Sequence, residues 1–235
     1  MKIIPQNRPH IKEFSKQARS YEEFNIIQKK AAKKLVESIK GKPKRILDIG
    51  CGNGEVYKNI DWEMELFIGV DLSSNMCNLH PKNGKTKIIC ENFENEKLYK
   101  ELKRLAPFDI VISSSALQWA EDLDKTLSYI SPLADKWALS IFCDKTFETI
   151  RKISNLPSFL PSKEEVVKTA LKYKKNSSFQ TVEYRLFFPD NLSKFRYIKK
   201  SGVSGGKRRL SFRETKKLIE NYPLPYLEFE VVYIT

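Results

Sequence analysis

Histidine is scarce in this chain of 235 residues, which contains only His10 and His80. A histidine-based metal site needs several such ligands, and a Ser-His-Asp triad needs a histidine placed beside its serine. We therefore expect neither a metal centre nor a serine hydrolase.

Long apolar runs are also missing. No stretch reaches the roughly 18 apolar residues that a membrane-spanning helix requires. Residues 1–19 are polar and basic, without the apolar segment of a secretory signal peptide. We expect a cytoplasmic protein that does not enter a membrane.

The four cysteines, Cys51, Cys77, Cys90 and Cys143, form no CxxC pair, and their spacings match no zinc pattern. Reduced thiols in a cytoplasmic protein are the simplest interpretation.

Positive charge is plentiful, with 42 Lys and Arg against 29 Asp and Glu and a formal net charge of +13. A basic surface attracts nucleic acid, anionic membranes or acidic proteins. A proteome rich in lysine explains the same excess without any partner, and composition does not separate the two.

The apolar pattern predicts a helical segment followed by alternating strands and helices. Phe24, Ile27, Ala31, Leu35 and Ile39 recur at helical spacing. Strands are predicted at 45–50, 66–71, 87–91, 109–114, 137–143, 179–188 and 228–234, with helices between them. This order predicts an α/β fold: a Rossmann-like, seven-stranded, mostly parallel sheet with helices on both faces and an antiparallel C-terminal hairpin.

The pattern sets the bounds of three regions, and their roles are those implied by the family that the motifs described next resemble. Residues 1–40 are expected to form an N-terminal helical lid. Residues 41–145 are expected to form a Rossmann-like core that binds the cofactor. Residues 146–235 are expected to supply insert helices, a region facing the substrate and the last two strands of the same domain.

A glycine loop follows the first strand, in the segment Asp48-Ile49-Gly50-Cys51-Gly52-Asn53-Gly54. Glycines allow a sharp turn close to a ligand, at the start of a helix. A dinucleotide fingerprint needs another glycine at position 55, which is Glu55 here, and Asp48 would repel a pyrophosphate. An acid suits a ligand with ammonium and sulfonium groups, so S-adenosylmethionine is expected ahead of a nicotinamide, a flavin or no ligand.

Acidic and amide side chains at the next two strand ends extend this prediction. Asp71 ends the second strand, where a carboxylate can accept both ribose hydroxyls. Asn92 and Phe93 follow the third strand, where they suit an adenine ring; an Asx-turn beside a core phenylalanine is the alternative.

Three segments resemble the motifs of class I S-adenosylmethionine-dependent methyltransferases: residues 47–54, 69–73 and 108–111. The resemblance implies methyl transfer that yields S-adenosylhomocysteine. We expect cofactor contacts from Asp48, Gly50, Cys51, Gly52, Gly54, Asp71, Leu72, Met76, Asn92, Phe93 and Ser113.

A finer resemblance spans most of the chain. The segment 113–119, which ends in Ala116-Leu117-Gln118-Trp119, and the helix with Leu192, Ser193, Arg196, Lys199 and Gly202 are similar to the malonyl-acyl-carrier-protein O-methyltransferase family of biotin synthesis. Phe14, Ala18, Tyr21 and Gln28 match the lid of that family. Ser114 stands where the family has Asn, and Asn92 where it has Asp.

This resemblance implies esterification of the free carboxyl of a malonyl thioester. A carboxylate is already ionised at neutral pH, so no residue is needed as an acid or base. Substrate positioning is expected from Tyr21, Gln118, Trp119, Arg196 and Lys199, with Arg196 favoured as the carboxylate ligand.

An acidic acyl carrier protein is the expected partner. Docking is assigned to Lys200, Lys207, Arg208 and Arg209, and a monomer is expected. Nucleic acid is the less favoured partner, because no RNA-binding appendage is recognisable. Methylation of RNA or of a small molecule, and a non-catalytic binding module with this fold, remain the alternatives.

Overall fold

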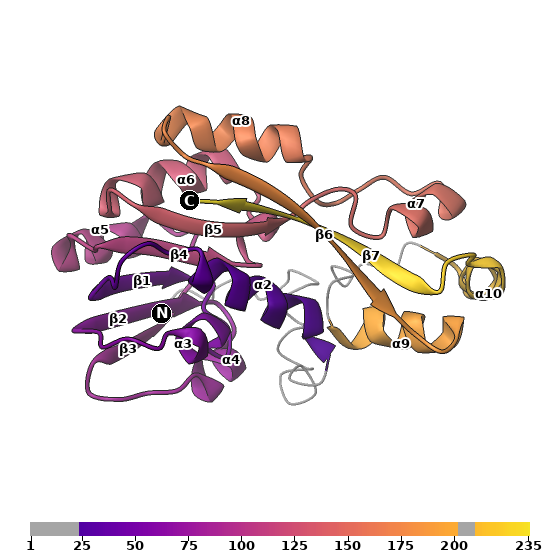
Figure 1. Ribbon diagram of the computed structural model, residues 1–235, viewed down its shortest axis with the longest axis horizontal. Coiled ribbons are helices and arrows are strands. Elements are labelled where there is room, and N and C mark those ends of the chain that lie inside the picture. Colours follow the sequence, from indigo (N-terminus) through magenta and orange to yellow (C-terminus); the bar gives the residue numbers. More distant parts are fainter. Residues whose placement is uncertain (1–23, 202–209) are drawn as a thin grey trace.

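The computed structural model describes residues 24–201 and 210–235, in which seven strands form one sheet (Figure 1). The strand order is β3-β2-β1-β4-β5-β7-β6. The strands are β1 (Arg45–Ile49), β2 (Leu66–Asp71), β3 (Thr86–Cys90), β4 (Ile110–Ser114), β5 (Trp137–Phe142), β6 (Phe179–Phe187) and β7 (Tyr226–Ile234).

Strand direction confirms the predicted topology. β1 to β5 pair in parallel, whereas β7 pairs antiparallel with both β5 and β6. The C-terminal hairpin is therefore antiparallel, and its second strand lies inside its first, next to β5. Six strands share one direction, so their carboxyl ends meet at one edge of the sheet, where ligands bind in open α/β sheets.

Helices cover both faces of the sheet, as predicted (Figure 1). They are α2 (Ile26–Glu37), α3 (Glu55–Asn59), α4 (Ser74–Leu79), α5 (Glu96–Leu105), α6 (Leu123–Ile130), α7 (Glu148–Ser154), α8 (Lys163–Tyr173), α9 (Asn191–Ser201) and α10 (Phe212–Asn221). Two short 3-10 turns add Leu117–Trp119 and Ser131–Leu133. None of the helices in the described ranges is long and apolar enough to cross a membrane.

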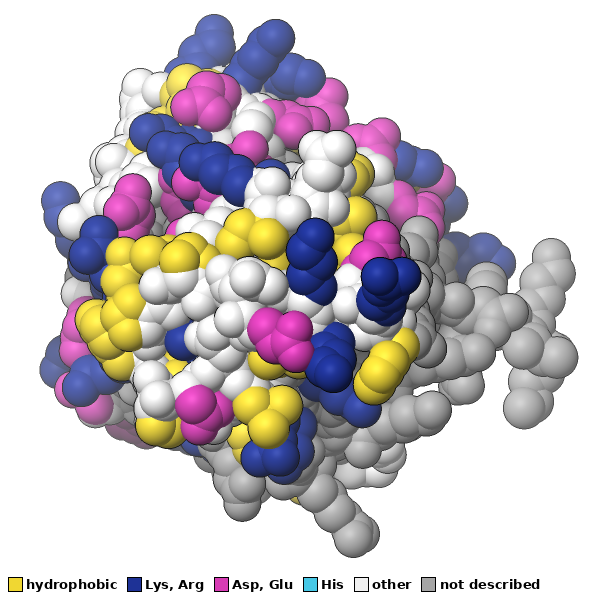
Figure 2. All heavy atoms as spheres, turned by 90° about the vertical axis from the view of Figure 1, so that its right-hand side faces the viewer, with side chains coloured by type: hydrophobic (Ala, Val, Ile, Leu, Met, Phe, Trp, Pro, Cys, Tyr) yellow, Lys and Arg dark blue, Asp and Glu magenta, His cyan; other side chains and the backbone are white. Residues whose placement is uncertain are grey.

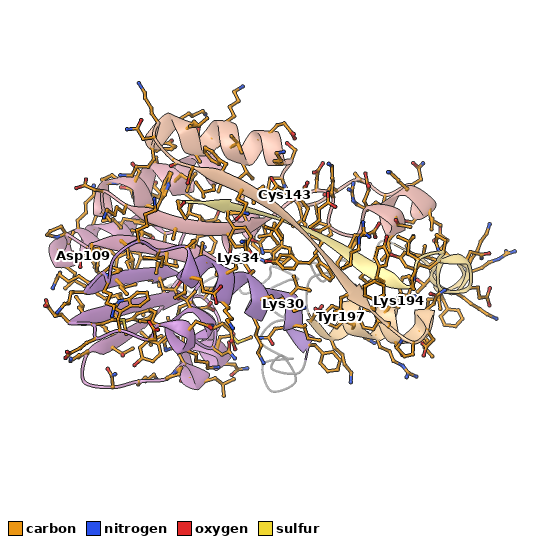
Figure 3. All side chains as sticks on the ribbon, in the orientation of Figure 1. Lys30, Lys34, Asp109, Cys143, Lys194 and Tyr197 are labelled. Atoms are coloured by element: carbon orange, nitrogen blue, oxygen red, sulfur yellow. The ribbon has the colours of Figure 1, made fainter. Side chains whose placement is uncertain are left out.

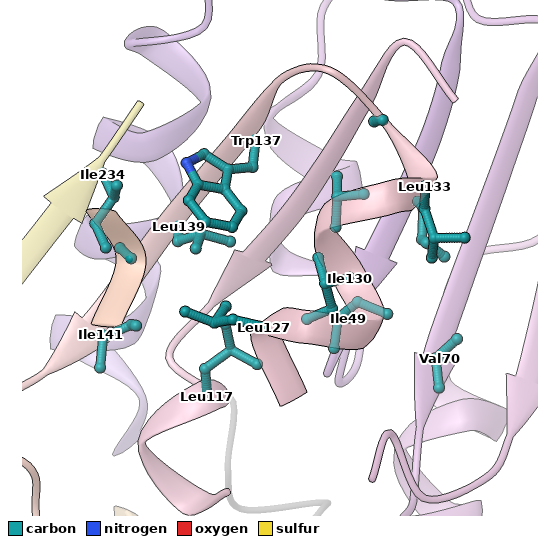
Figure 4. Packing of buried hydrophobic residues seen from close by; sticks show 14 of the residues in the cluster. Ile49, Val70, Leu117, Leu127, Ile130, Leu133, Trp137, Leu139, Ile141 and Ile234 are labelled. Carbon is teal, nitrogen blue, oxygen red and sulfur yellow. The ribbon is translucent and has the colours of Figure 1, made fainter. Parts of the chain in front are cut away.

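Alternating side chains along the strands divide the core into two clusters. Leu47 and Ile49 of β1 pack with α5, α6 and α8 on one face (Figure 4), whereas Ile46 packs with α2 and α3 on the other. This alternation is the period of two that a strand imposes. Buried faces on both sides account for the nearly continuous apolar runs of β1, β2, β4 and β5.

Helix α2 is anchored to the sheet rather than detached from it. Ile27, Ala31 and Leu35 are fully buried against the second cluster. The helix ends at Glu37, two residues before the predicted end. The described part of the predicted lid is therefore packed on the core, next to the carboxyl edge of the sheet.

Ile141 offers a direct test of the core on the face drawn in Figure 4, where it is fully buried in β5. Ile141→Ala should lower the free energy of unfolding by about 2–5 kcal/mol, because it removes buried methylenes and leaves a cavity. The matched Ile141→Val should lower it by only about 0.5–1.5 kcal/mol. Urea denaturation followed by circular dichroism measures both; equal stability of the two variants would contradict this packing.

Candidate functional site

A pocket lies where β1, β2 and β4 end. It is lined by Gln28, Ala32, Gly50, Cys51, Gly52, Asn53, Glu55, Val56, Asp71, Leu72, Ser73, Met76, Asn92, Phe93, Ser114, Ser115, Ala116 and Trp119. Helix α2 provides one wall and the loops after the strands provide the others. The pocket therefore occupies the edge at which the parallel topology predicts a ligand.

The glycine loop is held against two neighbouring strand ends. The backbone N–H groups of Gly50 and Cys51 both donate to Val70 O, at 2.7 and 3.0 Å. A Cβ atom placed on Gly50 would lie 2.1 Å from Cβ of Ala116, so only glycine allows the loop after β4 to approach this closely. Gly50 also has a φ of +75°, which favours glycine.

Asp71 joins the end of β2 to this loop. Its Oδ2 accepts a hydrogen bond from Gly52 N at 2.9 Å, and its Oδ1 accepts one from Ser73 N at 2.8 Å. Burial raises the pKa of Asp71, and these two hydrogen bonds partly offset that rise. Each carboxylate oxygen keeps a second lone pair, so the group can still accept hydrogen bonds from a ligand in the pocket.

Asp48 lies beneath the glycine loop, fully buried in β1. Neither of its carboxylate oxygens has a hydrogen-bond partner in the part of the chain that the structure describes. Burial, and secondarily the charge of Asp71, raises the pKa of Asp48 well above its ordinary value. A buried carboxylate without a partner is unfavourable, and a cationic ligand would offset that cost.

The charges around the pocket favour a cationic ligand. Its acidic lining residues are Asp71 and Glu55, and Glu55 pairs with Lys58 at 3.2 Å. Asp48, a predicted cofactor residue, is not among the lining residues; it is buried in β1, two residues before Gly50. Among the lining residues that the structure describes there is no lysine, arginine or histidine. Ammonium and sulfonium groups fit this environment, whereas a pyrophosphate would be repelled.

Most of the predicted cofactor residues meet at this pocket. Gly50, Cys51, Gly52, Asp71, Leu72, Met76, Asn92 and Phe93 line it. Gly54 begins α3 and faces His80 and Pro81, and the buried hydroxyl of Ser113 donates to Ile49 O at 2.7 Å. Gly54 and Ser113 therefore stand behind the lining, where they hold the loop and strand.

The environment of Asn92 differs from the predicted one in detail. Its Oδ1 already accepts a hydrogen bond from Glu94 N at 3.0 Å, which is the Asx-turn alternative. This oxygen keeps a second lone pair, and the amide nitrogen can donate, so Asn92 can still bond a ligand. Phe93 lines the pocket and also packs against the core, and its contact with adenine stays a prediction.

The predicted substrate residues do not all lie at the pocket. Trp119 lines the pocket and stacks on Phe159, with ring centroids 5.8 Å apart. Gln118 is buried, and its Nε2 donates to Ser115 O at 2.7 Å. Tyr21 lies outside the described residues.

The basic residues of α9 lie outside the pocket lining. Arg196, Lys199 and Lys200 are exposed. Figure 3 shows the neighbouring Lys194 and Tyr197 at the opposite end of the molecule from Asp109, which precedes β4. Helix α9 therefore lies beyond the carboxyl edge of the sheet. Lys207, Arg208 and Arg209 lie outside the described residues.

Several lining residues carried no clear sequence signal. Ser73 caps α4 by accepting a hydrogen bond from Met76 N. Ser115 and Ala116 follow β4, where a ligand-facing loop was foreseeable from topology alone. Gln28 reaches the pocket only because α2 packs at this edge, and a helical pattern does not show which buried side chain meets a cavity.

The described ranges 24–201 and 210–235 contain no group of three or more His, Cys, Asp or Glu side chains placed to hold a metal ion.

Comparison with known proteins agrees with this geometry. Residues 47–134 match the family model described as a methyltransferase domain. Malonyl-[acyl-carrier protein] O-methyltransferase of Halalkalibacterium halodurans is 27% identical over 128 residues, which are 50% of this chain and 47% of that protein. The enzyme of the same name from Bacillus cytotoxicus is 26% identical over 208 residues, 82% of this chain and 65% of that protein.

These alignments thus span less than two thirds of either relative. Among solved structures, a Thermotoga maritima protein described as a SAM-dependent methyltransferase, possibly acting on histamine, has a TM-score of 0.55 at 14% identity. That alignment covers 95% of this chain and 98% of the other. The fold is therefore the Rossmann-like fold of such methyltransferases.

The substitution Asp48→Asn should weaken ligand binding without lowering the stability of the fold. The variant should bind S-adenosylhomocysteine at least about tenfold more weakly, because a buried charge pair loses one partner. Its thermal midpoint at neutral pH should equal or exceed that of the wild type, because an unpaired buried charge has been removed. Calorimetric titration and thermal unfolding measure the two effects. Asp135→Asn, an exposed position away from the pocket, serves as the control.

The pH dependence of binding follows from the raised pKa of Asp48. Below that pKa the carboxyl is protonated and cannot pair with an ammonium group, so affinity should fall as pH falls through it. The pKa of Asp71 is also raised, so protonation of Asp71 should likewise weaken binding as the pH falls. Titrations between pH 5 and 9 should show proton release on binding, with a smaller slope in Asp48→Asn. A flat profile in the wild type would contradict the assignment.

Proposed function

We propose that this protein is an S-adenosylmethionine-dependent methyltransferase. The observation that carries the proposal is the buried, unpartnered carboxylate of Asp48 beneath the glycine loop, with Asp71 at the next strand end. Two acids at these positions, and no described cation in the lining, fit a ligand with a cationic amino acid end and a ribose.

Each end of the pocket suits one part of that cofactor. Asp48 would hold the ammonium group, and Asp71 would accept hydrogen bonds from the ribose hydroxyls. Leu72, Met76 and Phe93 would enclose the adenine with apolar surface. When bound, the cofactor supplies a methyl group activated by its sulfonium. The residues of the chain bind the cofactor, orient the acceptor and exclude water.

We further propose that the methyl acceptor is a carboxylate, the free end of a malonyl thioester on acyl carrier protein. The names of the two relatives support this choice. The pocket supports it as well, because its described lining offers no histidine or lysine as a base. A carboxylate is already ionised and needs no base. Proximity and orientation of the two reactants then lower the barrier to methyl transfer.

Docking of the carrier protein is assigned to the basic end of the molecule. Arg196, Lys199 and Lys200 are exposed on α9, so they suit a partner surface better than the ligation of a carboxylate inside the pocket. Figure 2 shows this end, where Lys and Arg side chains lie among exposed apolar ones. Leu192 and Phe212, 48% and 76% exposed, belong to α9 and α10. An acidic amphipathic partner fits this mixture.

Incubation with S-adenosylmethionine and malonyl-acyl carrier protein tests the proposal. Mass spectrometry of the carrier should show the gain of one methyl group on the malonyl form and none on the unmodified form. Asp48→Asn should reduce the rate through weaker cofactor binding. Malonate and tRNA are run in parallel, because methylation of either one in place of the carrier would replace the proposed acceptor with a small molecule or with RNA.

A further inference from the structure

Three consecutive serines lie at the carboxyl end of β4: Ser113 and Ser114 are its last two residues and Ser115 follows it, and their hydroxyls have different partners. Ser113 Oγ donates to Ile49 O at 2.7 Å, and Ser114 Oγ lies 3.0 Å from Ser140 Oγ. Ser115 Oγ is buried and has no hydrogen-bond partner within the described ranges. A buried hydroxyl without a partner is unfavourable, so its persistence at a pocket wall indicates a ligand.

The backbone fixes the position of Ser115. Its φ is +59°, in the left-handed region that a serine rarely adopts. Ser115 N donates to Ser140 O at 2.9 Å, and Ser115 O accepts from Gln118 Nε2 at 2.7 Å. The N–H and C=O groups of Ser115 therefore both have hydrogen-bond partners, and its hydroxyl is the polar group left to bond a ligand. Unusual backbone held by surrounding bonds is typical of functional sites.

The neighbours of Ser115 place it between the cofactor loop and the outer part of the pocket. Ala116, the next residue, packs directly against Gly50. Trp119, four residues on, lines the same pocket and stacks on Phe159, which is 37% exposed. Ser115 therefore lies on the wall that runs from the glycine loop toward solvent, by which an acceptor would enter.

We propose that the Ser115 hydroxyl positions the methyl acceptor by donating a hydrogen bond to its carboxylate oxygen. This inference rests on the proposed function and adds the residue that orients the acceptor. Asp48 and Asp71 would serve the ammonium group and the ribose hydroxyls of the cofactor, and as acceptors they cannot bind a carboxylate. The carboxylate of the cofactor itself is the competing ligand of this hydroxyl, and the affinity for S-adenosylhomocysteine tests it separately. A neutral donor in this wall would orient the acceptor carboxylate without adding a positive charge to a pocket that takes a cationic cofactor.

This assignment explains the role of Gln118. Its Nε2 holds Ser115 O, and its own Oε1 is buried without a partner in the described structure. Gln118 is thus a positioning residue that acts through Ser115. Arg196 was predicted to bind the acceptor carboxylate. The proposal assigns this role to the Ser115 hydroxyl instead, because Arg196 is exposed on α9 whereas Ser115 lines the pocket.

Ser115→Ala and Ser115→Gly test the proposal together. Both remove the hydroxyl, while glycine also tolerates the left-handed backbone. With malonyl-acyl carrier protein, both should lower kcat/KM by about 10- to 100-fold, the range for a hydrogen bond to a charged group, with a raised KM. The affinity for S-adenosylhomocysteine should match the wild type, and the thermal midpoint should equal or exceed it, because a buried unpartnered hydroxyl has been removed. Ser128→Ala, a surface serine of α6, is the control.

Four results would overturn the assignment. Unchanged kcat/KM in both variants would leave the hydroxyl without a role while the methyltransferase proposal stands. Full activity of Ser115→Gly alone would assign the effect of Ser115→Ala to the backbone. Weaker binding of S-adenosylhomocysteine would assign the hydroxyl to the cofactor. No methylation of the carrier by the wild type would refute the proposed acceptor, and with it the carboxylate as the ligand of Ser115.

Discussion

The close approach of two backbone segments, at Gly50 after β1 and Ala116 after β4, is the constraint on which this molecule depends. A Cβ atom on Gly50 would lie 2.1 Å from that of Ala116, so any other residue would force the loops apart. Because the loops touch, Asp71 and Ser115 line one pocket, and Asp48 is buried in β1 two residues before Gly50. The parallel order of β2, β1 and β4 brings these strand ends together, and the glycine lets them close.

Near this contact lie buried polar groups that do not stabilise the folded protein. Within residues 24–201 and 210–235, neither the buried carboxylate of Asp48 nor the buried hydroxyl of Ser115 has a hydrogen-bond partner, and Ser115 has a φ of +59°. Such groups lower the stability of the free protein, and a core buried on both faces of the sheet compensates. Their positions fit the proposed chemistry: Asp48 and Asp71, before and after the glycine loop, suit a cation, and Ser115 in the same region offers a neutral donor.

Much of the fold was predictable because its signals are local. Short apolar runs and helical spacing located the seven strands and α2, and the glycines with Asp71 located the pocket. Contacts that depend on tertiary packing were not predictable. Gln28 lines the pocket only through the docking of α2, and Ser115 differs from Ser113 and Ser114 only in its hydrogen bonds. Arg196 matched a sequence pattern, yet its side chain is exposed outside the pocket lining.

A crystal structure with S-adenosylhomocysteine tests the central claim, that one pocket at this edge is built around a cationic ligand. The account predicts the ammonium group within about 3 Å of Asp48 or of one bridging water, and the ribose hydroxyls on Asp71. A ligand with its ammonium group directed to solvent, or its ribose away from Asp71, would contradict it.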